Sequence, residues 1–584
     1  MRFFYVRLTT SGPQCQRPSD NAENLAISNF GWFPSNSQPR NETAAALALA
    51  AGSTGGALLG CSSGAKRRSN NEAYDLLIKN GTVFDGTGAA PGVMDLGLRD
   101  GKIAALGPAL AGNAAEVIDA AGLMVAPGFI DVHTHCDLTF QRAGWKRPLA
   151  RFMPSWKGNY NYLYQGVTTV VTGNCGYGYP DAAEFLDAID SFNFGTNVSH
   201  LAPHGMIRLQ LFGPNQPGEL SLAQMDALKA RVGEEMDKGV VGLSAGLEYS
   251  PGLITPTSEL IELCKVVRAR GGLFTVHIRD ESGAIPGRFG EAEAIEEAIE
   301  IARRAEIPVE ISHLKISKPL GDLTPARVMD MIEAARAEGL DVTADQYPYD
   351  AGSTELSYLL PDEFRAANGV KDEFKTKEGR KLLARAINKV FVYLPPDLTT
   401  VSMNTENEDY EGKNLDQIAG MMGKSPEEAF ADLVSQDNTP VAIFFFQDVE
   451  IVRAFMPRDY VITASDGWTI PKGMTKPHPR VYGTFPRKLK RFVLDENIMP
   501  LTAAIRSMTS LPAKKFGLKD RGRLAEGLVA DLAVIDLNTI GDLATFQDPH
   551  QYSTGIVHLL VSGQAAIKNR EATGVGAGRA LRRT

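Results

Sequence analysis

Six side chains that could bind a metal or move a proton follow predicted β-strands in this sequence. They are His133, His135, Cys175, His277, His313 and Asp466. On an extended strand, residues two positions apart point to the same side, so His133 and His135 could reach one point. Imidazole and thiolate ligands together suit zinc better than magnesium or calcium. Each residue alone has an ordinary structural explanation, but six that converge at the ends of predicted strands predict a metal centre.

The elements that must position these side chains alternate between strands and helices. Amphipathic stretches such as 221–239 and 291–306 separate strand-like runs. The eight runs are 128–135, 168–174, 197–204, 240–249, 273–280, 308–315, 340–349 and 459–467. This pattern predicts an α/β fold, a TIM-like (β/α)8 barrel whose chemistry lies at the carboxyl ends of the strands.

Two β-rich segments flank this barrel. Residues 73–127 and 508–578 contain short alternating runs with Asn-Gly and Asp-Gly turns, which predicts one composite β domain, a small β-sandwich built from both ends. The barrel would then span 128–507. The stretch at about 350–455 is too long for an ordinary connection between a strand and a helix. We therefore expect an insertion over the barrel mouth.

The first 72 residues differ from the rest. They are predicted to be a disordered extension, and the run 43–65 carries no charge. Its Leu58-Leu59-Gly60-Cys61 string resembles a bacterial lipobox, which would make the protein exported, periplasmic or lipid-anchored at Cys61. Two alternatives stay open: an Ala/Gly-rich tail without a targeting role, and a cytoplasmic protein.

Composition narrows the class only coarsely. Against 69 acidic residues the 584-residue chain has 60 Lys and Arg, a formal net charge of −9. A general nucleic-acid binder would carry a basic surface, so nucleic acid is not an expected partner. Five cysteines in so long a chain do not predict a disulfide framework.

Several strings together resemble a known family. The string 126–135, APGFIDVHTH, is similar to the opening motif of the amidohydrolase superfamily of metal-dependent hydrolases. The further strings resemble D-aminoacylases, also called N-acyl-D-amino-acid deacylases, and cover about 74–574. They are GNCG at 173–176, GLSAGLEYSPG at 242–252, VHIRDES at 276–282, ISHLK at 311–315, DQYPY at 345–349, SDG at 465–467 and HPRVYGTFPR at 478–487.

The resemblance assigns the metal ligands. It implies a tight zinc site at Cys175, His277 and His313, with Cys175 able to bridge to a weaker site at His133 and His135. The fourth strand ends in SAGLE at 244–248, without the lysine that dihydroorotases and hydantoinases carbamylate. One tightly bound zinc ion is thus implied, and occupancy of a second site stays open.

Asp466 is the predicted acid and base. It would accept the proton of a metal-activated water and pass it to the leaving amine, while its alternative is a helix N-cap. The candidates for holding the carboxylate of the substrate are Lys315, Arg279 and Arg480, with Tyr249, Tyr347 and Tyr349 adding hydrogen bonds. For each cation the alternative is a salt bridge to a nearby Asp or Glu. We expect one of the three cations to form such a salt bridge instead of binding the substrate.

The implied reaction is hydrolysis of the linear amide bond of a small N-acyl-D-amino acid, or a related N-acyl amino acid or dipeptide. Preference for the D form comes from the resemblance alone. Two other hypotheses stay open: hydrolysis of cyclic amides or another C–N bond, as in dihydropyrimidinases and hydantoinases, and a barrel that binds without catalysis. The sequence fixes neither the substrate side chain nor the oligomeric state.

Overall fold

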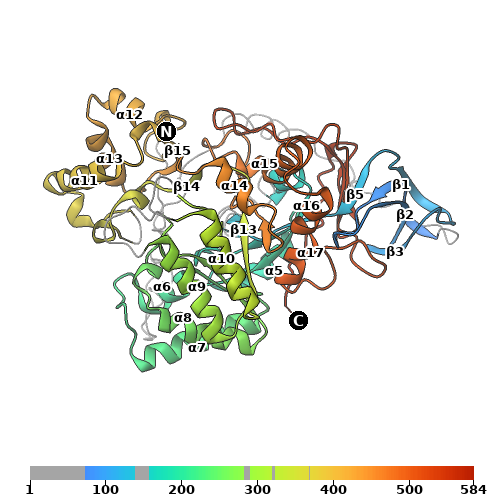
Figure 1. The fold of residues 1–584 in the computed structure, drawn as a ribbon, viewed down its shortest axis with the longest axis horizontal. Coiled ribbons are helices and arrows are strands. Elements are labelled where there is room, and N and C mark those ends of the chain that lie inside the picture. The colour runs from blue at the N-terminus through green and yellow to red at the C-terminus, as the bar shows by residue number, and fades with distance from the viewer. Residues whose placement is uncertain (1–72, 138–156, 282–289, 318–322, 367–368, 584) are drawn as a thin grey trace, which may run out of the picture.

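The computed structural model describes residues 73–137, 157–281, 290–317, 323–366 and 369–583. The predicted extension, including Cys61, lies outside the described residues. Among the described helices, none combines the length and the apolar character that crossing a membrane requires. In Figure 1 the barrel lies in the middle of the molecule, with a sheet domain at one end of the long axis and the insertion toward the other.

The barrel strands form in all eight predicted regions, the third region containing two short strands. They are β6 (Phe129–Asp131), β7 (Val167–Thr172), β8 (Asn197–His200), β9 (Ala202–Pro203), β10 (Gly242–Gly246), β11 (Leu273–His277), β12 (Val309–Ile311), β13 (Val342–Gln346) and β17 (Val461–Thr463). Their pairings are parallel, in the orders β6-β7-β8 and β9-β10-β11-β12-β13-β17. A parallel bridge from Thr134 to Gly467 joins the first strand region to the last. The predicted α/β barrel fold is confirmed.

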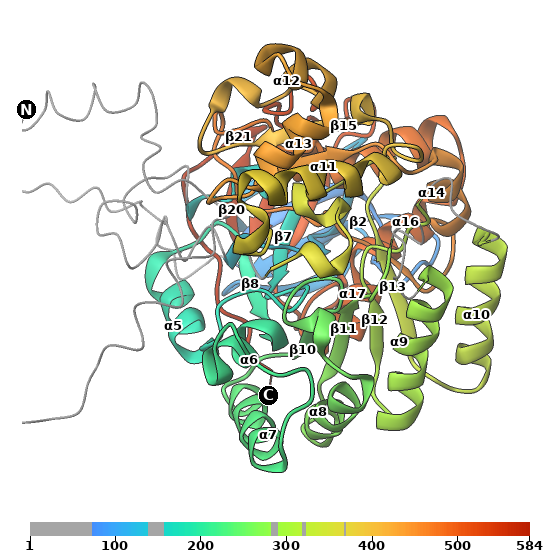
Figure 2. The ribbon, with the colours of Figure 1, turned by 90° about the vertical axis from the view of Figure 1, so that its left-hand side faces the viewer.

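Helices surround these strands, as Figure 2 shows for α5 to α10. They are α4 (Tyr160–Leu163), α5 (Ala182–Phe192), α6 (His204–Phe212), α7 (Leu222–Asp237), α8 (Thr257–Ala269), α9 (Glu291–Ala305), α10 (Pro325–Ala337), α14 (Val449–Phe455), α15 (Arg480–Arg487), α16 (Leu501–Met508) and α17 (Ser510–Lys515). A short 3₁₀ turn, η2 (Gly252–Ile254), and a π-helical segment, η8 (Lys488–Asp495), complete this set.

Local sequence explains where these helices begin and which face they bury. Ser221 and Gln224 form a capping box at the start of α7, satisfying backbone N–H groups that the helix leaves free. In α9, acidic residues occupy the first turn and Arg303 and Arg304 the last, which complements the helix dipole. The apolar faces pack on outward strand residues such as Phe274 and Ile311 in the largest core.

The other side of these strands faces the barrel interior and is polar. Ser244 on β10 pairs in register with Thr275 on β11, Thr275 with Glu310 on β12, and Glu310 with Thr343 on β13. Residues paired in register point to the same face of a sheet. This buried polar layer therefore lies one step below His277, which is two residues beyond Thr275 on the same face.

The sheet domain draws strands from both ends of the described chain. Its strands are β1 (Tyr74–Val83), β2 (Gly92–Arg99), β3 (Lys102–Gly107), β4 (Ala114–Asp119), β5 (Met124–Pro127), β18 (Leu532–Ile535), β19 (Ile556–Val561), β20 (Gln564–Lys568) and β21 (Glu571–Ala572). They make one continuous sheet in the order β21-β20-β19-β18-β5-β1-β2-β3, with β4 beside β1. Antiparallel pairing of β5 with β18 joins the two segments, and the sheet has its own apolar core.

The insertion between β13 and β17 has a sheet and a core of its own. Its longer elements are β14 (Gly352–Glu355), α11 (Lys377–Val390), β15 (Thr399–Met403), α12 (Leu415–Met422), α13 (Pro426–Val434) and β16 (Val441–Phe444). Short 3₁₀ turns connect them: η3 (Leu356–Leu359), η4 (Asp362–Phe364), η5 (Asp372–Phe374), η6 (Pro396–Leu398) and η7 (Glu408–Tyr410). The antiparallel order β14-β16-β15 packs on these helices.

Candidate metal centre

Three predicted ligands from the second, fifth and sixth strand regions meet in one triangle. The Cys175 Sγ lies 3.9 Å from His277 Nδ1 and 3.9 Å from His313 Nε2. The two histidine nitrogens are 3.1 Å apart. All three side chains are buried, so the triangle is a compact set of one sulfur and two nitrogen donors.

A second set of donors shares the same thiol. The Cys175 Sγ lies 3.2 Å from His133 Nε2, on the side of the first strand. Asp466 Oδ1 is 3.3 Å from His135 Nε2 and 3.6 Å from His133 Nε2. Its Oδ2 is 3.8 Å from His313 Nε2, so this carboxylate reaches both sets. The structure thus brings all six predicted residues together.

These spacings suit zinc. Zinc–nitrogen bonds of about 2.0–2.1 Å and zinc–sulfur bonds of about 2.3 Å put tetrahedral donors about 3.3–3.6 Å apart. The Cys175, His277 and His313 distances of 3.1–3.9 Å surround that interval. The distances from His133 Nε2 to the Cys175 Sγ and to Asp466 Oδ1, 3.2 and 3.6 Å, also lie close to that interval. Both donor sets therefore fit a metal ion, with Cys175 placed to serve either or both.

A carboxylate holds the other ring nitrogen of each of three histidines. Asp345 Oδ2 lies 3.2 Å from His133 Nδ1, and Glu248 Oε2 lies 3.0 Å from His277 Nε2. Glu281 Oε1 lies 2.8 Å from His313 Nδ1. Such carboxylate–histidine pairs fix the tautomer and the ring orientation of a metal ligand. The two rings of the tight set therefore present opposite nitrogens, Nδ1 of His277 and Nε2 of His313, to the same point.

Sequence reasoning did not assign roles to these three acids. Glu248, Glu281 and Asp345 all lie within the strings 242–252, 276–282 and 345–349 that carry the family resemblance. Their partners come from neighbouring strands or from the loop beyond a strand, so no fixed spacing marks the pairs. The usable signal was their position just after, or at the end of, a barrel strand.

The backbone is left-handed at three of the site residues. Cys175 has φ of 55°, His313 of 39° and Asp466 of 50°. Residues other than glycine rarely adopt this conformation, and they keep it where the surrounding contacts enforce it. Asp345 Oδ1 accepts from the His313 backbone N–H at 2.9 Å, and the Asp466 N–H donates to the His133 carbonyl at 2.9 Å. Neighbouring strands thus hold these turns in place.

The ionisable groups of the cluster stabilise one another's charges. Burial raises the pKa of the Cys175 thiol, but the charge and hydrogen bond of His133 outweigh it, so the pKa falls well below its usual range. Burial likewise opposes ionisation of Asp466, and Arg480 and His313 hold its pKa well below normal nonetheless. Although burial lowers it, hydrogen bonding by Asp466 and Cys175 raises the pKa of His135 to about 9. The lowered pKa values of Cys175 and Asp466 favour the ionised forms in which a thiol and a carboxyl group bind metals.

Two of the predicted cations border this centre. Lys315 Nζ lies 2.7 Å from His313 Nδ1 and donates to Glu281 at 2.6 Å. Arg480 Nη1 forms an ion pair with Asp466 Oδ2 at 2.9 Å. Both cations approach the ring of Tyr347, Lys315 at 6.0 Å and Arg480 at 4.7 Å from its centroid. These two cations and the tyrosine thus form one group beside the metal ligands.

The two remaining predicted tyrosines, Tyr249 and Tyr349, differ in their distance from the metal ligands. The Tyr249 ring lies 4.6 Å from the His277 ring, and its hydroxyl is 3.0 Å from Thr354 of the insertion. Tyr349 donates to the Pro479 carbonyl at 3.3 Å and packs on Arg487 rather than on a metal ligand. Tyr249 therefore borders the centre, whereas the predicted substrate contact of Tyr349 has no support in this geometry.

The prediction for Arg279 also needs correction. Its guanidinium donates to both oxygens of Glu297 on α9, at 2.8 and 2.7 Å, and to the carbonyls of Leu253 and Thr255. Strand β11 ends at His277 and Arg279 lies two residues beyond it, so the alternation of side chains along the strand does not fix the direction of Arg279. All three cations pair with an acid, but Arg279 is the one whose partner, Glu297, lies on a helix away from the metal ligands.

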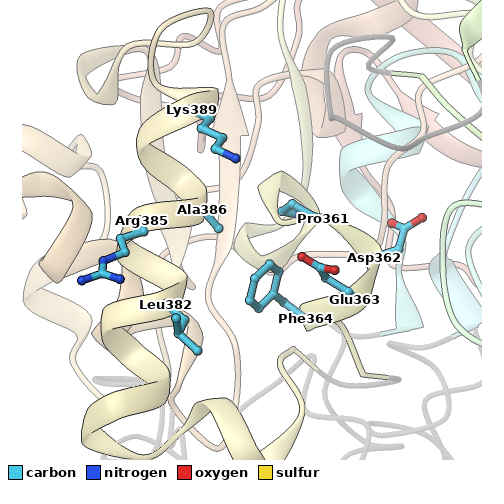
Figure 3. A pocket seen from close by; sticks show the side chains of 8 residues that line it. All are labelled: Pro361, Asp362, Glu363, Phe364, Leu382, Arg385, Ala386 and Lys389. Carbon is cyan, nitrogen blue, oxygen red and sulfur yellow. The ribbon is translucent and has the colours of Figure 1, made fainter.

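A separate surface pocket lies on the insertion, between η4 and α11 (Figure 3). Its lining includes Phe364, Leu382, Arg385 and Lys389. None of the predicted site residues lines it. The chemistry predicted from the sequence therefore concerns the barrel rim and not this pocket.

Comparison with known proteins agrees with the site. A model described as "Amidohydrolase family" matches residues 116–188 and 458–567. A D-aminoacylase from Alcaligenes xylosoxydans xylosoxydans is 33% identical over 88% of this chain and 99% of its own. The crystal structure of N-acyl-D-glutamate deacylase from Bordetella bronchiseptica, complexed with zinc and a phosphonate mimic of the tetrahedral intermediate, is 31% identical with a TM-score of 0.73. That similarity covers 87% of this chain and 99% of the other.

A third structure concerns the metal count. A D-aminoacylase described with a binuclear metal centre, one-metal activation and second-metal attenuation is 32% identical to this chain, with a TM-score of 0.73. The similarity covers 87% of this chain and all of the other. On these grounds the protein belongs to the D-aminoacylase family of the amidohydrolases.

Proposed function

We propose that this protein hydrolyses the amide bond of N-acyl-D-amino acids and releases a carboxylate and a free D-amino acid, with zinc as its metal. One observation carries the proposal. The carboxylate of Asp466 contacts the predicted metal ligands on one side and Arg480 on the other. A group that moves protons is thereby placed between a metal centre and a cation that could hold an anionic substrate.

Cys175, His277 and His313 would hold the tightly bound zinc ion, and His133 and His135 would contribute to a second. A bound zinc ion would supply Lewis acidity, polarising the amide carbonyl and lowering the pKa of water from about 15.7 to about 7. Asp466 is kept ionised by Arg480, so it can accept a proton from the attacking water. It then returns that proton to the amine that leaves.

The substrate carboxylate is assigned to Arg480 and Lys315. Both are buried and already held, Arg480 by Asp466 and Lys315 by Glu281, so little side-chain freedom is lost when a substrate binds. The planar guanidinium suits a carboxylate because it can donate two parallel hydrogen bonds. Tyr347 supports both cations with its ring.

Selectivity for the D form rests on the similarity to D-aminoacylases. The insertion reaches the site through Thr354, which meets the Tyr249 hydroxyl, and through the Ser353 carbonyl, which accepts from Arg480. We assign recognition of the substrate side chain to this part of the insertion.

The experiment is a metal assay combined with a panel of N-acetyl-D- and N-acetyl-L-amino acids. We expect zinc in the purified protein and release of free amine from the D series. The Asp466→Ala variant should lose about 10²- to 10⁴-fold in kcat. An inactive zinc-loaded protein over the whole panel would reject the proposed substrate class, and wild-type turnover by Asp466→Ala would reject the proposed base.

Hydrolysis of cyclic amides is the competing function. The end of β10 carries Ser244 and then Glu248, whose carboxylate is engaged by His277, and no lysine stands there to bridge two metals. Activity on hydantoins or dihydropyrimidines, without activity on N-acyl amino acids, would favour this alternative. A protein that binds zinc and N-acyl amino acids without turnover would favour a non-catalytic barrel.

We also propose export with a lipid on Cys61, which the Leu58-Leu59-Gly60-Cys61 string supports. Expression in a bacterium with a radiolabelled fatty acid tests it, with Cys61→Ser as the control. Equal labelling of both proteins, or none of either, contradicts the proposed anchor.

A further inference from the structure

Cys175 lies in a turn just beyond the end of strand β7, so the hydrogen bonds of the sheet do not hold it in place. Strand β7 ends at Thr172, and the three following residues with positive φ are Gly173 at 78°, Cys175 at 55° and Gly176 at 70°. A left-handed cysteine between two left-handed glycines needs restraint from outside the turn. The position of the Sγ atom depends on that restraint.

The fourth strand supplies this restraint through one hydroxyl. Ser244 on β10 is fully buried on the interior side of the barrel, in register with Thr275. Its Oγ accepts a hydrogen bond from the Gly176 N–H at 3.1 Å and donates one to the Gly173 carbonyl. A single side chain therefore joins the residues on both sides of Cys175.

The same turn is fixed to the first strand region by its own amide side chain. Asn174 Nδ2 donates toward the carbonyls of Val132 at 3.2 Å, Thr134 at 3.4 Å and Val171 at 3.1 Å. The carbonyls of Val132 and Thr134 flank His133, a ligand of the second donor set. Asn174 thus fixes the position of the turn relative to His133. Ser244 fixes its position relative to β10, the neighbour of the strand that carries His277.

The packing leaves the turn no room to shift toward β10. A methyl group added to Gly246, near the end of β10, would lie 2.2 Å from the Cys175 carbonyl oxygen. One added to Gly176 would lie 2.9 Å from the Gly246 nitrogen. Because the turn is pressed against β10, the Ser244 hydroxyl acts on a short, stiff segment.

We propose that Ser244 is a positioning residue for the metal-binding thiolate. The fourth strand supplies no ligand of its own, and it acts through the Ser244 hydroxyl that holds the ligand of the second strand. Without that hydroxyl, the buried Gly176 N–H and Gly173 carbonyl lose their partner, and the turn relaxes so that the sulfur moves from the shared position. This inference rests on the proposed zinc-dependent function.

The test uses the full-length protein loaded with Co²⁺, whose thiolate-to-cobalt charge-transfer band reports a metal–sulfur bond directly. We expect Ser244→Ala to lose most of this band and to bind Zn²⁺ about 10- to 100-fold more weakly in competition with a chelator. Ser244→Thr keeps the hydroxyl and should restore both. Ser553→Ala is the matched control, because this buried serine also donates to a backbone carbonyl, that of Tyr482, away from the cluster.

A Ser244→Ala protein with the wild-type band and zinc affinity overturns the proposal, as does an equal loss in Ser553→Ala. Should Ser244→Ala fail to fold, Ser244→Thr decides. A wild-type band then supports the hydroxyl, and a lost band with native circular dichroism contradicts it. Failure of the proposed function is distinguishable, because a wild-type protein with the band but without deacylase activity leaves the Ser244 comparison intact.

Discussion

The ends of β11 and β12 carry the same short pattern and use it differently. His277-Ile278-Arg279 and His313-Leu314-Lys315 each place a cation two residues beyond a metal-binding histidine. Lys315 returns to its histidine at 2.7 Å, whereas Arg279 turns to Glu297 on the neighbouring helix. Identical spacing therefore does not give an identical site.

The backbone explains the difference. Val276 pairs with Ile311, so regular alternation would place Ser312, not His313, level with His277. The left-handed conformation of His313 breaks this alternation and brings both its ring and Lys315 to the site. His277 needs no such break, because it is the last residue of β11 and already faces inward. The cation that follows a regular strand end leaves the site, and the one that follows a left-handed residue stays.

The largest expected difference between the two strand ends is in catalysis. Lys315→Met removes a buried cation from Glu281 and from the proposed carboxylate site, so kcat/KM should fall about 10²- to 10³-fold. Arg279→Met should stay within about threefold, because its partners lie on α9 and in the η2 loop. Steady-state kinetics on one N-acetyl-D-amino acid compare them. Equal losses in the two variants would contradict the distinction.

The Arg279→Met variant also tests, through its stability, what the buried pair of Arg279 with Glu297 contributes to the fold. Arg279→Met leaves Glu297, whose side chain is 3% exposed, without its cation, and breaking such a buried pair costs about 3 kcal/mol. Urea unfolding measures this change. Lys265→Met, which breaks the exposed pair with Glu262, serves as the control and should unfold close to wild type. An Arg279→Met protein as stable as that control would show the buried pair to be dispensable.

Much of this site could be predicted because its ligands are rare residue types at strand ends. The sequence has only 9 histidines and 5 cysteines, and the barrel period places five of them together. The acids that orient the rings were not predictable in the same way. Asp and Glu number 69, and Glu248, Glu281 and Asp345 find their histidines across strands rather than at a fixed spacing.

The misassigned residues mark where strand periodicity stops. Arg279 and Tyr349 both lie beyond a strand, because β11 ends at His277 and β13 at Gln346. Backbone turns decide orientation beyond those points, and a left-handed residue other than glycine has only a weak sequence signal, an enrichment of Asn, Asp and His. The length of the stretch at about 350–455 predicts the insertion but not its structure. Its sheet and helices bury a core that is independent of the barrel, so the barrel pattern gives no information about them.

Asp345 provides a smaller test of why the two ends differ. It accepts from the His313 backbone N–H through Oδ1 and holds His133 Nδ1 through Oδ2. An amide at this position can accept on only one side, so Asp345→Asn should weaken Zn²⁺ binding about 10- to 100-fold. Chelator competition measures it, with the half-exposed Asp341→Asn as control. Wild-type affinity for Zn²⁺ in Asp345→Asn would show that the left-handed turn at His313 does not need the Asp345 carboxylate.

The smallest expected effect concerns what a carboxylate does for a buried lysine. Burial opposes the charge of Lys315, but Glu281 outweighs it and raises the pKa of the amine. Among the described residues, the amine of Lys488 donates to the hydroxyls of Thr463 at 2.8 Å and Ser507 at 2.9 Å, and burial lowers its pKa to about 7. An unfolded lysine titrates near about 10.4. Between about pH 7 and about pH 10.4, therefore, Lys488 binds a proton in the unfolded chain but not in the folded protein.

Stability should therefore rise with pH from about 7 toward about 10 through Lys488, by about 1 kcal/mol per pH unit, and this contribution should be flat below pH 7. Lys488→Met removes that slope, because methionine does not titrate. Urea unfolding at pH 7.5 and 8.5 measures the difference between the two proteins, in which the other titrating groups cancel. A wild-type slope in Lys488→Met would mean that the amine stays charged beside two hydroxyls. A buried lysine in this protein would then stay charged without a carboxylate, and Glu281 would not be needed to keep Lys315 charged.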